Sequence, residues 1–306
     1  MAEKLTIDQF REVLPKVCGK ETSADPDGWT PENPTWGHCA VATMVAQDMF
    51  GGKIMRASLE NTAFAKMRSH YFVRFDETKG DALVLDPTDA QFRPSLDPDD
   101  KSFFFQLYQH SESRTREYLW SDERTRDRYK ALMYRLAKHL AGDNIIFSDS
   151  RFWHCIRTAL NSPCQKLKFG SVLLHNGEVV AEAANKPIPG LEDMCPSGNC
   201  IRMNIQSRTE SMLGACGHSE EWAMEDAIRQ GFFLQRCELY VAGIDVHTGR
   251  AYIKKEPEFT CLRCAAQMKM HDLGKVYVPV GHRWEAMSPE QALQSAKAFA
   301  LKQKSV

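Results

Sequence analysis

The chain has 306 residues, which exceeds one domain of typical size and predicts two folded units. Apolar residues make up 43% of the sequence, enough for packed cores, so the composition excludes wholesale disorder. A net charge of -1 excludes a general electrostatic attraction to nucleic acid. The ten cysteines come with no signal peptide and no apolar run long enough to span a membrane. We therefore expect a cytoplasmic protein, without membrane contact, whose thiols bind metal or act in catalysis.

The first hundred residues predict a small α+β domain, which we place at residues 1–100. An apolar helix begins in the run 36–42 and ends at the glycine pair 51–52. Two strand-like runs follow, at 69–72 and 84–92. This order predicts a helix followed by neighbouring strands.

Three residues of this domain form a candidate catalytic set. Cys39 stands at the predicted helix N-terminus, His70 on the first strand and Asp86 on the second. A helix N-terminus and an imidazole lower the pKa of a thiol, and a carboxylate orients the imidazole. The three could therefore form a cysteine nucleophile site. The alternative is structural, with a buried cysteine, a polar residue at a strand end and a turn former before Pro87.

The same segment resembles the small YunG-like proteins. The shared pattern is Gly37-His38-Cys39-Ala40, the glycine pair 51–52, His70-Tyr71 and the run 86–92, within about residues 29–92. The resemblance implies a fold related to papain-like or transglutaminase-like cysteine enzymes. It implies no defined activity.

The next segment predicts a helical linker, which we place at residues 101–145. A Pro- and Asp-rich connector at 94–101 leads into a charged helical stretch over 121–141. Its basic residues could indicate phosphate or RNA contact, but acidic residues are interleaved with them. We favour a solvated helix that turns one apolar stripe toward a domain. The stripe consists of Tyr129, Leu132, Met133 and Leu136.

The remainder, residues 146–306, predicts alternating helices and strands. Asn176-Gly177 joins two short apolar runs as a tight hairpin. This order indicates an α/β fold with a mixed sheet covered by helices. In chain order we predict a helix over 151–161 with Ser150 as N-cap, strands over 170–174 and 179–181, a helix over 219–231, a strand over 239–242, a helix over 261–273 and a strand over 275–280.

Two motifs in this part indicate a metal site. His218-Ser219-Glu220 is followed by Cys261-Leu262-Arg263-Cys264, which together supply one imidazole, two thiols and one carboxylate. Three ligands leave the fourth tetrahedral position of zinc open, which is typical of a catalytic site. Both motifs lie at predicted helix N-termini, where the helix dipole favours a thiolate. The alternative is a redox motif, or a chance pairing of a Cys-x-x-Cys with a distant histidine.

These motifs and the order of elements resemble the cytidine/deoxycytidylate deaminase superfamily, from about residue 149 onward. The resemblance implies a zinc cofactor bound by His218, Cys261 and Cys264. It implies that Glu220 is the proton shuttle in the hydrolytic loss of ammonia from an amino-substituted base. It also implies a homo-oligomer, because these enzymes often assemble as dimers, tetramers or hexamers.

Two further regions are assigned to substrate by the same resemblance. Asn185, which follows the hairpin, is implied to help hold the sugar or base. The segment 195–202 lies where deoxycytidylate deaminases carry a Cys- and Arg-containing substrate loop, which makes Arg202 a substrate-binding candidate. A free cytidine or deoxycytidylate type of nucleotide is therefore the leading substrate class.

The chain departs from the family pattern at three points. Ser219 replaces the usual alanine between the histidine and the glutamate, and Thr260 replaces the usual proline before the first cysteine. The spacing from Glu220 to Cys261 is also long, and we attribute it to an inserted hairpin over 244–252. No catalytic group is lost.

The other cysteines of this part leave two readings open. Cys195, Cys200 and Cys216 could form a second, structural metal site with His154 or Cys155. The alternative is that they are buried small hydrophobic residues, as free cysteines often are. We favour the second reading because this region contains no Cys-x-x-Cys spacing.

Two other functions remain open at this point. The protein could deaminate a polynucleotide, with the N-terminal domain guiding it to DNA or RNA. It could instead be a Cys39-dependent hydrolase whose C-terminal domain senses a nucleotide. A purely binding C-terminal domain is disfavoured because all four groups of the metal site are present.

Overall fold

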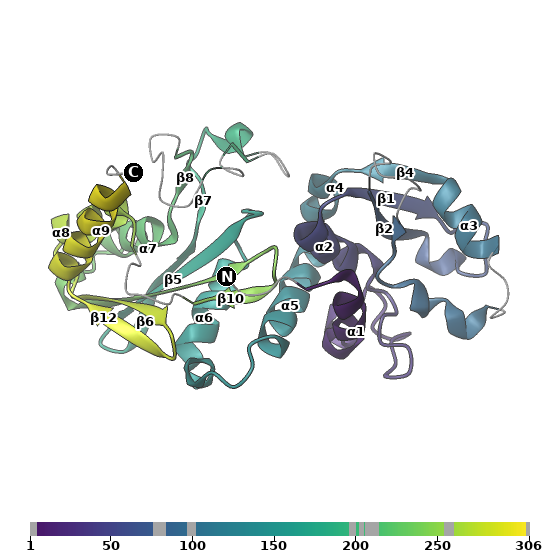
Figure 1. The fold of residues 1–306 in the computed structure, drawn as a ribbon, viewed down its shortest axis with the longest axis horizontal. Helices are drawn as coiled ribbons and strands as arrows, with labels where there is room; N and C mark the ends of the chain where they lie inside the picture. The colour runs from purple at the N-terminus through teal and green to yellow at the C-terminus, as the bar shows by residue number, and fades with distance from the viewer. Residues whose placement is uncertain are drawn as a thin grey trace. The chain divides into compact units, whose positions relative to one another are not determined.

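The computed structural model describes residues 5–75, 84–96, 102–195, 200–201, 205, 214–253 and 260–303. The chain forms two compact units (Figure 1), Met1–Leu140 with His247–Gly249 and Ala141–Val246 with Arg250–Val306. Both units combine helices with a sheet, so the predicted α/β class is confirmed. In the part of the chain that the structure describes, no helix is long and apolar enough to cross a membrane.

The N-terminal unit is built on a four-stranded antiparallel sheet in the order β3-β2-β1-β4. The strands are β1 (Lys53–Ser58), β2 (Ser69–Arg74), β3 (Val84–Leu85) and β4 (Ser111–Arg114). The strand predicted over 84–92 ends at Leu85, so the prediction was wrong for residues 86–92. The chain turns there because the Thr88 N–H donates to the Asp86 carboxylate at 3.0 Å, forming an Asx turn.

Five helices in the described part of this unit accompany the sheet. They are α1 (Ile7–Val17), α2 (Cys39–Phe50), α3 (Ser102–Gln109), α4 (Arg116–Ser121) and α5 (Glu123–His139). Helix α2 is buried on almost every side and contacts β2 and α5. It ends at Gly51, whose φ of 79° is a conformation that glycine adopts without steric cost. Cys39 is therefore the first residue of a central helix.

The stretch predicted as a linker over 101–145 belongs to this unit as far as Leu140. The predicted apolar stripe of α5 is buried, and β4 pairs with β1 at the edge of the sheet. A buried network ties the stretch to α2: Arg116 donates to Asp48 at 2.8 Å, and the Tyr129 hydroxyl donates to the same carboxylate at 2.5 Å. The charged surface of α5 gave it the appearance of a linker, whereas its buried face makes it part of the core.

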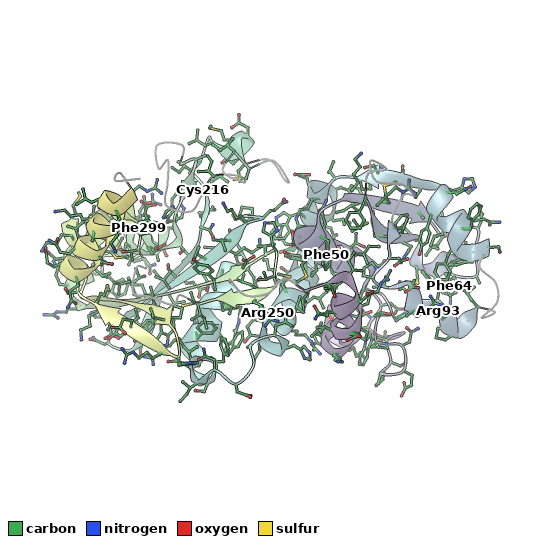
Figure 2. All side chains as sticks on the ribbon, in the orientation of Figure 1. Phe50, Phe64, Arg93, Cys216, Arg250 and Phe299 are labelled. Atoms are coloured by element: carbon green, nitrogen blue, oxygen red, sulfur yellow. The ribbon has the colours of Figure 1, made fainter. Side chains whose placement is uncertain are left out.

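Aromatic rings fill the other side of the sheet. Phe64 lies 4.7 Å from Phe92 between ring centroids, and Phe92 lies 4.9 Å from the ring of His70. Phe64 and Arg93 are both labelled in this region in Figure 2. The guanidinium of Arg93 stacks over Phe104 at 5.7 Å. This cluster packs against the His70 imidazole and restricts its orientation.

The C-terminal unit contains a six-stranded mixed sheet. Its order is β12-β11-β9-β5-β6, and β10 pairs with β9. The strands β9 and β11 are parallel, and the remaining pairs are antiparallel. The bounds are β5 (Leu167–His175), β6 (Glu178–Ala184), β9 (Cys237–Asp245), β10 (Arg250–Tyr252), β11 (Lys275–Val280) and β12 (Arg283–Met287).

Local signals in the sequence predicted several of these elements well. Asn176 and Gly177 have φ values of 53° and 83°, which confirms the tight hairpin between β5 and β6. The hairpin predicted over 244–252 is formed by β9 and β10. The N-cap of the helix predicted from 151 is Asp149 and not Ser150, because the Asp149 carboxylate accepts the Arg151 N–H at 2.8 Å.

Helices cover both faces of this sheet (Figure 1). They are α6 (Ser150–Ala159), α7 (Ser219–Arg229), α8 (Leu262–Met270) and α9 (Pro289–Gln303). Gly170 and Ser171 are neighbours on β5 and therefore point to opposite faces. A Cβ at Gly170 would lie 2.1 Å from the Cys155 carbonyl of α6, so only glycine permits this packing. The Ser171 hydroxyl contacts Ser219 at the start of α7, on the opposite face.

A short two-stranded ribbon leads into α7. It pairs β7 (Lys186–Pro187) with β8 (Cys216–Gly217), and Lys186 lies opposite Gly217. The residue after β8 is His218, and the residue before β7 is Asn185. The ribbon therefore brings the start of α7 close to the end of the β5–β6 hairpin.

Candidate active site

The three predicted metal ligands meet at the starts of two helices. His218 is the N-cap of α7, Cys261 is the N-cap of α8, and Cys264 lies in the first turn of α8. The Nδ1 atom of His218 lies 3.2 Å from the Cys264 sulfur and 3.3 Å from the Cys261 sulfur. All three ligand atoms lie within 4.8 Å of one another. The structure therefore assembles the predicted set with Nδ1 as the histidine ligand atom.

The donor atoms and their spacing fit zinc. One nitrogen and two sulfurs form the ligand set typical of a catalytic zinc site with one open position. In a tetrahedral zinc site the nitrogen and sulfur ligands lie about 3.5 Å apart, as the usual bond lengths require. The observed nitrogen–sulfur separations of 3.2 and 3.3 Å are close to this value.

The electrostatic environment of Cys261 favours the thiolate form that binds metal. The hydrogen bond from the Cys264 thiol lowers the pKa of Cys261 to about 3, and His218 acts in the same direction against the opposing effect of burial. The Cys264 N–H also reaches the Cys261 sulfur, at 3.4 Å. A thiolate is the form that binds metal, so this environment favours the liganding state.

Glu220 is buried beside the ligands. It is 8% exposed, and its charge interacts with those of His218 and Cys261. Burial raises its pKa above the ordinary value for a glutamate. The Ser219 hydroxyl donates to Glu220 Oε2 at 3.1 Å and accepts from the Ser171 hydroxyl at 2.8 Å. The serine that departs from the family pattern thus holds the carboxylate in place.

Two residues that the sequence analysis did not select support the ligands. The Glu221 carboxylate accepts the His218 N–H at 2.8 Å and an Arg263 guanidinium N–H at 2.6 Å. Arg263 also donates to the Cys216 carbonyl at 2.9 Å. The pair therefore joins the starts of α7 and α8. A glutamate at the third helical position is a capping-box signal, which could have identified Glu221.

Asn185 is bound to the backbone of β5. Its side-chain oxygen accepts the Phe169 N–H at 2.7 Å, and its amide nitrogen donates to the Leu167 carbonyl at 3.2 Å. These bonds fix the end of the hairpin beside the α7 start. A role of Asn185 in substrate binding stays a prediction. Arg202, the other predicted substrate residue, lies outside the described residues.

The three cysteines of the predicted structural site lie together. The hydrogen bond to Cys216 raises the pKa of the Cys195 thiol, while a hydrogen bond to Cys200 lowers it. All three are partly exposed, so the interpretation as buried hydrophobic residues was wrong. His154 and Cys155 are directed elsewhere, toward Glu182 at 2.5 Å and the Tyr240 carbonyl at 3.4 Å. Metal binding by the three cysteines stays a prediction.

A cleft of about 470 Å³ lies along the outer faces of α7 and α8. Its lining includes Trp222, Met224 and His271 but neither the ligands nor Glu220. Glu221 and Arg263 form its border with the metal site. The cleft is therefore adjacent to the metal site and does not open onto Glu220.

The candidate set of the N-terminal unit is also brought together. The His70 Nε2 atom lies 2.6 Å from Asp86 Oδ2, and both side chains are buried, at 0% and 3% exposed. The charge of Cys39 interacts with that of His70, and the Cys39 sulfur lies 3.9 Å from the carbonyl oxygen of Ser69, the residue before His70. The structure thus places the three predicted residues in one chain of contacts.

Two family models match the chain, and together they cover both units. Residues 6–141 match the YunG protein model, and residues 148–280 match the model of the cytidine and deoxycytidylate deaminase zinc-binding region. A comparison with curated proteins found no match. Zinc is accordingly the cofactor of the His218 site. The chain has a two-part architecture, in which a unit that matches the YunG protein model precedes a unit that matches the model of the cytidine and deoxycytidylate deaminase zinc-binding region.

Proposed function

We propose that the C-terminal unit hydrolytically deaminates a free nucleotide of the cytidine or deoxycytidylate type. The observation that carries the proposal is a catalytic ligand set, His218, Cys261 and Cys264, next to the buried carboxylate of Glu220. Zinc, when bound there, supplies a Lewis acid that lowers the pKa of a bound water to about 7. Glu220 carries out the proton transfers of the reaction.

In this reaction water replaces the amino group of the base and ammonia leaves. Glu220 takes one proton from the attacking water and places it on the ring nitrogen next to the reacting carbon. It then transfers the second proton to the amino group, which departs as ammonia. Ser219 and Ser171 orient the carboxylate for both transfers. Burial at 8% exposure limits competition from bulk water.

A free nucleotide is favoured over a polynucleotide by charge. The chain has a net charge of -1, so it has no general attraction for a long phosphate backbone. Lys168 lies near the predicted substrate loop, where its charge acts on Cys195, but it is 1% exposed and its ammonium donates to the Ser162 carbonyl. It therefore does not decide between the two substrate classes.

The test is ammonia release by zinc-loaded protein from deoxycytidylate, cytidylate and the two corresponding nucleosides, with single-stranded DNA and RNA alongside. Glu220→Gln keeps the side-chain shape but cannot carry the protons, so we expect its rate to fall by roughly 10²- to 10⁴-fold. Glu225→Gln is the matched control. Glu225 lies on the same helix in an exposed pair with Arg229 at 2.5 Å, and its substitution should leave the rate unchanged.

Each outcome is informative about the substrate. Release from a mononucleotide, lost in Glu220→Gln, would support the proposal, and a nucleotide preferred over its nucleoside would support recognition of the phosphate. Release from the oligonucleotides alone, falling steeply with salt, would replace the proposal with a polynucleotide deaminase. Absence of release from every compound by protein shown to contain zinc would overturn the substrate class.

A further inference from the structure

The N-terminal unit contains a polar cluster that the deaminase reaction does not use. His70 Nε2 contacts Asp86 Oδ2 at 2.6 Å. The carboxylate is fixed by two more donors, the Tyr108 hydroxyl at 3.1 Å and the Thr88 N–H at 3.0 Å. Burial lowers the pKa of His70, but the charge and hydrogen bond of Asp86 outweigh it and raise that pKa to about 10. The carboxylate therefore holds the imidazole in one orientation and stabilises its protonated form.

The other imidazole nitrogen is available to the thiol. Because Nε2 contacts Asp86, Nδ1 is the imidazole nitrogen that remains for Cys39, whose charge interacts with that of His70. Gln91 fixes this side: its Nε2 lies 3.4 Å from His70 Nδ1, and its Oε1 accepts the Gly37 N–H at 3.2 Å. Gln91 thus connects the imidazole to the loop that carries the cysteine. Gln91 is itself buried, at 1% exposed, so this connection is rigid.

Cys39 also lies in a positive environment. It is the first residue of the twelve-residue helix α2, whose first N–H groups have no acceptor within the helix. Arg128 of α5 interacts electrostatically with the same thiol. Among the residues that the structure describes, the buried Nη1 of Arg128 has no hydrogen-bond partner. Leaving a buried guanidinium nitrogen without a hydrogen-bond partner costs free energy. That cost is offset if a negative charge forms beside it during a reaction.

We propose that Cys39, His70 and Asp86 form a second hydrolytic site, in which the Cys39 thiolate attacks an amide, ester or thioester carbonyl. The imidazole is the base, the carboxylate orients it, and the helix N-terminus with Arg128 stabilises negative charge on sulfur and on the carbonyl oxygen. Cys39 is 7% exposed and His70 is 0% exposed, so Cys39 is the more exposed of the two residues. This site is independent of the proposed deaminase function.

The proposed reaction has two steps. With the proton on His70 Nδ1, the Cys39 thiolate forms a bond to the carbonyl carbon. The bond to the amine, alcohol or thiol leaving group breaks, and that group departs with the proton from His70. Water then attacks the thioester and gives a proton to the now neutral His70, which releases the carboxylic acid and regenerates the Cys39 thiolate beside the protonated imidazole.

The experiment measures alkylation of Cys39 by iodoacetamide in the full chain between pH 5 and pH 9, with the modified peptide identified by mass spectrometry. Cys18, buried in the same unit, is the internal reference. The groups that set the profile are His70, Tyr71 and Arg128 around the sulfur, with Asp86 and Tyr108 behind the imidazole. We expect Cys39 to be alkylated faster than Cys18 at pH 6, because His70, the start of α2 and Arg128 together favour a reactive sulfur.

His70→Gln should slow Cys39 alkylation at pH 6 by roughly 10- to 100-fold, because it removes the imidazole beside the sulfur. Asp86→Asn should shift the profile in the same direction and serves as the second variant if His70→Gln does not fold. His110→Gln, an exposed histidine of the same unit, is the matched control and should change nothing. Glu220→Gln should also leave the profile unchanged, which separates this site from the deaminase.

A second readout tests acyl transfer. Incubation with p-nitrophenyl acetate should give a burst of about one p-nitrophenolate per chain, with the acetyl group on Cys39 and no burst in Cys39→Ala. Two results would overturn the proposal. One is a Cys39 alkylation profile in the native chain that matches an ordinary thiol and is insensitive to both His70→Gln and Asp86→Asn. The other is the absence of any acetyl group on Cys39.

Discussion

The hydroxyl of Ser219 links the sheet to the buried carboxylate of Glu220. It donates to Glu220 at 3.1 Å and accepts from Ser171 on β5 at 2.8 Å, and both serines are fully buried. Ser219→Ala removes the donor without removing the carboxylate. We expect kcat to fall roughly five-fold, the equivalent of about 1 kcal/mol, because Glu220 is then less well oriented.

The measurement is steady-state kinetics with zinc content determined in parallel. Zinc content should not change, since the ligands are untouched. Ser148→Ala, an exposed serine of the same unit, is the control. A Ser219→Ala enzyme with unaltered kcat would show that Glu220 needs no such support.

His38, next to Cys39, gives a pH prediction for the N-terminal unit. Its Nδ1 lies 2.9 Å from the Trp36 carbonyl and its Nε2 lies 2.7 Å from the Thr22 hydroxyl. Burial lowers the pKa of His38 to about 4, and the charge of Arg128 acts in the same direction. Because the unfolded chain binds the proton more tightly, stability is present above about pH 6.5 and is lost as the pH falls toward 4.

Urea unfolding of wild type and His38→Gln at pH 7 and pH 5 measures this effect. Between these pH values we expect wild type to lose roughly 2 kcal/mol more of its free energy of unfolding than the variant does. Comparing the two proteins removes the contribution of every other titrating group. An identical loss in both proteins would mean that the pKa of His38 is the same in the folded and the unfolded chain.

The two motifs and the family resemblance predicted the candidate ligands and Glu220, and the structure brings His218, Cys261 and Cys264 within 4.8 Å of one another. The Ser171–Ser219 contact could not be predicted, since its partners are 48 residues apart and meet only when β5 packs beside α7. For Asn185, the sequence predicted the position of the residue but not its hydrogen bonds. The sequence located it beside the site, but both groups of its amide bind the backbone of β5.

At the scale of elements, the metal site depends on how two helices begin. Glu221 joins these starts, because it accepts from the His218 N–H at 2.8 Å and from Arg263 at 2.6 Å. Glu221→Ala therefore removes a cap and an ion pair next to two ligands. We expect zinc affinity to fall roughly 10- to 100-fold, as for other residues that orient metal ligands.

Competition with a zinc-binding dye measures that change, and Arg263→Met should lower the affinity in the same direction. Glu225→Ala, one turn later on α7, is the control, because its pair with Arg229 is exposed and distant from the ligands. Equal zinc affinity in Glu221→Ala and Glu225→Ala would contradict a supporting role for Glu221.

Helix α5 shows why an element can be found while its role is mistaken. Its high density of charged residues indicated a solvated linker. The same helix carries Tyr129, Leu132 and Leu136 at helical spacing, and all three are buried against the rest of the unit. Periodicity predicted the stripe, whereas the surface that covers it comes from α1 and α2 and is not visible in local sequence.

At the scale of the whole molecule, zinc should stabilise one unit and not the other. All three ligands belong to the C-terminal unit. Because zinc binds only folded protein at this site, its removal lowers the stability of that unit by mass action. We expect a chelator to lower one calorimetric transition by roughly 10 °C and to leave the transition of the N-terminal unit in place.

The Cys264→Ser variant is the control for this experiment. Its transition should already lie at the lower temperature and should not respond to the chelator, since Cys264 supplies one of the three ligands. A chelator that lowered both transitions of wild type equally would show that the two units unfold as one.

The two-part organisation could be predicted, but the boundary between the units could not. The match to the YunG family ends at residue 141, and the first compact unit runs to Leu140. The sequence placed the end of the first domain at residue 100, where Pro- and Asp-rich composition resembles a linker. The strand β4 and helix α5 lie beyond that point and complete the sheet and core.

The two ligands His218 and Cys261 are themselves the N-cap residues of α7 and α8. Metal binding by these two residues therefore also fixes the starts of both helices. In a cell short of zinc, the starts of α7 and α8 would therefore fray and become accessible to proteases. We expect zinc scarcity to act on the lifetime of this protein, so that its amount in the cell falls together with its activity.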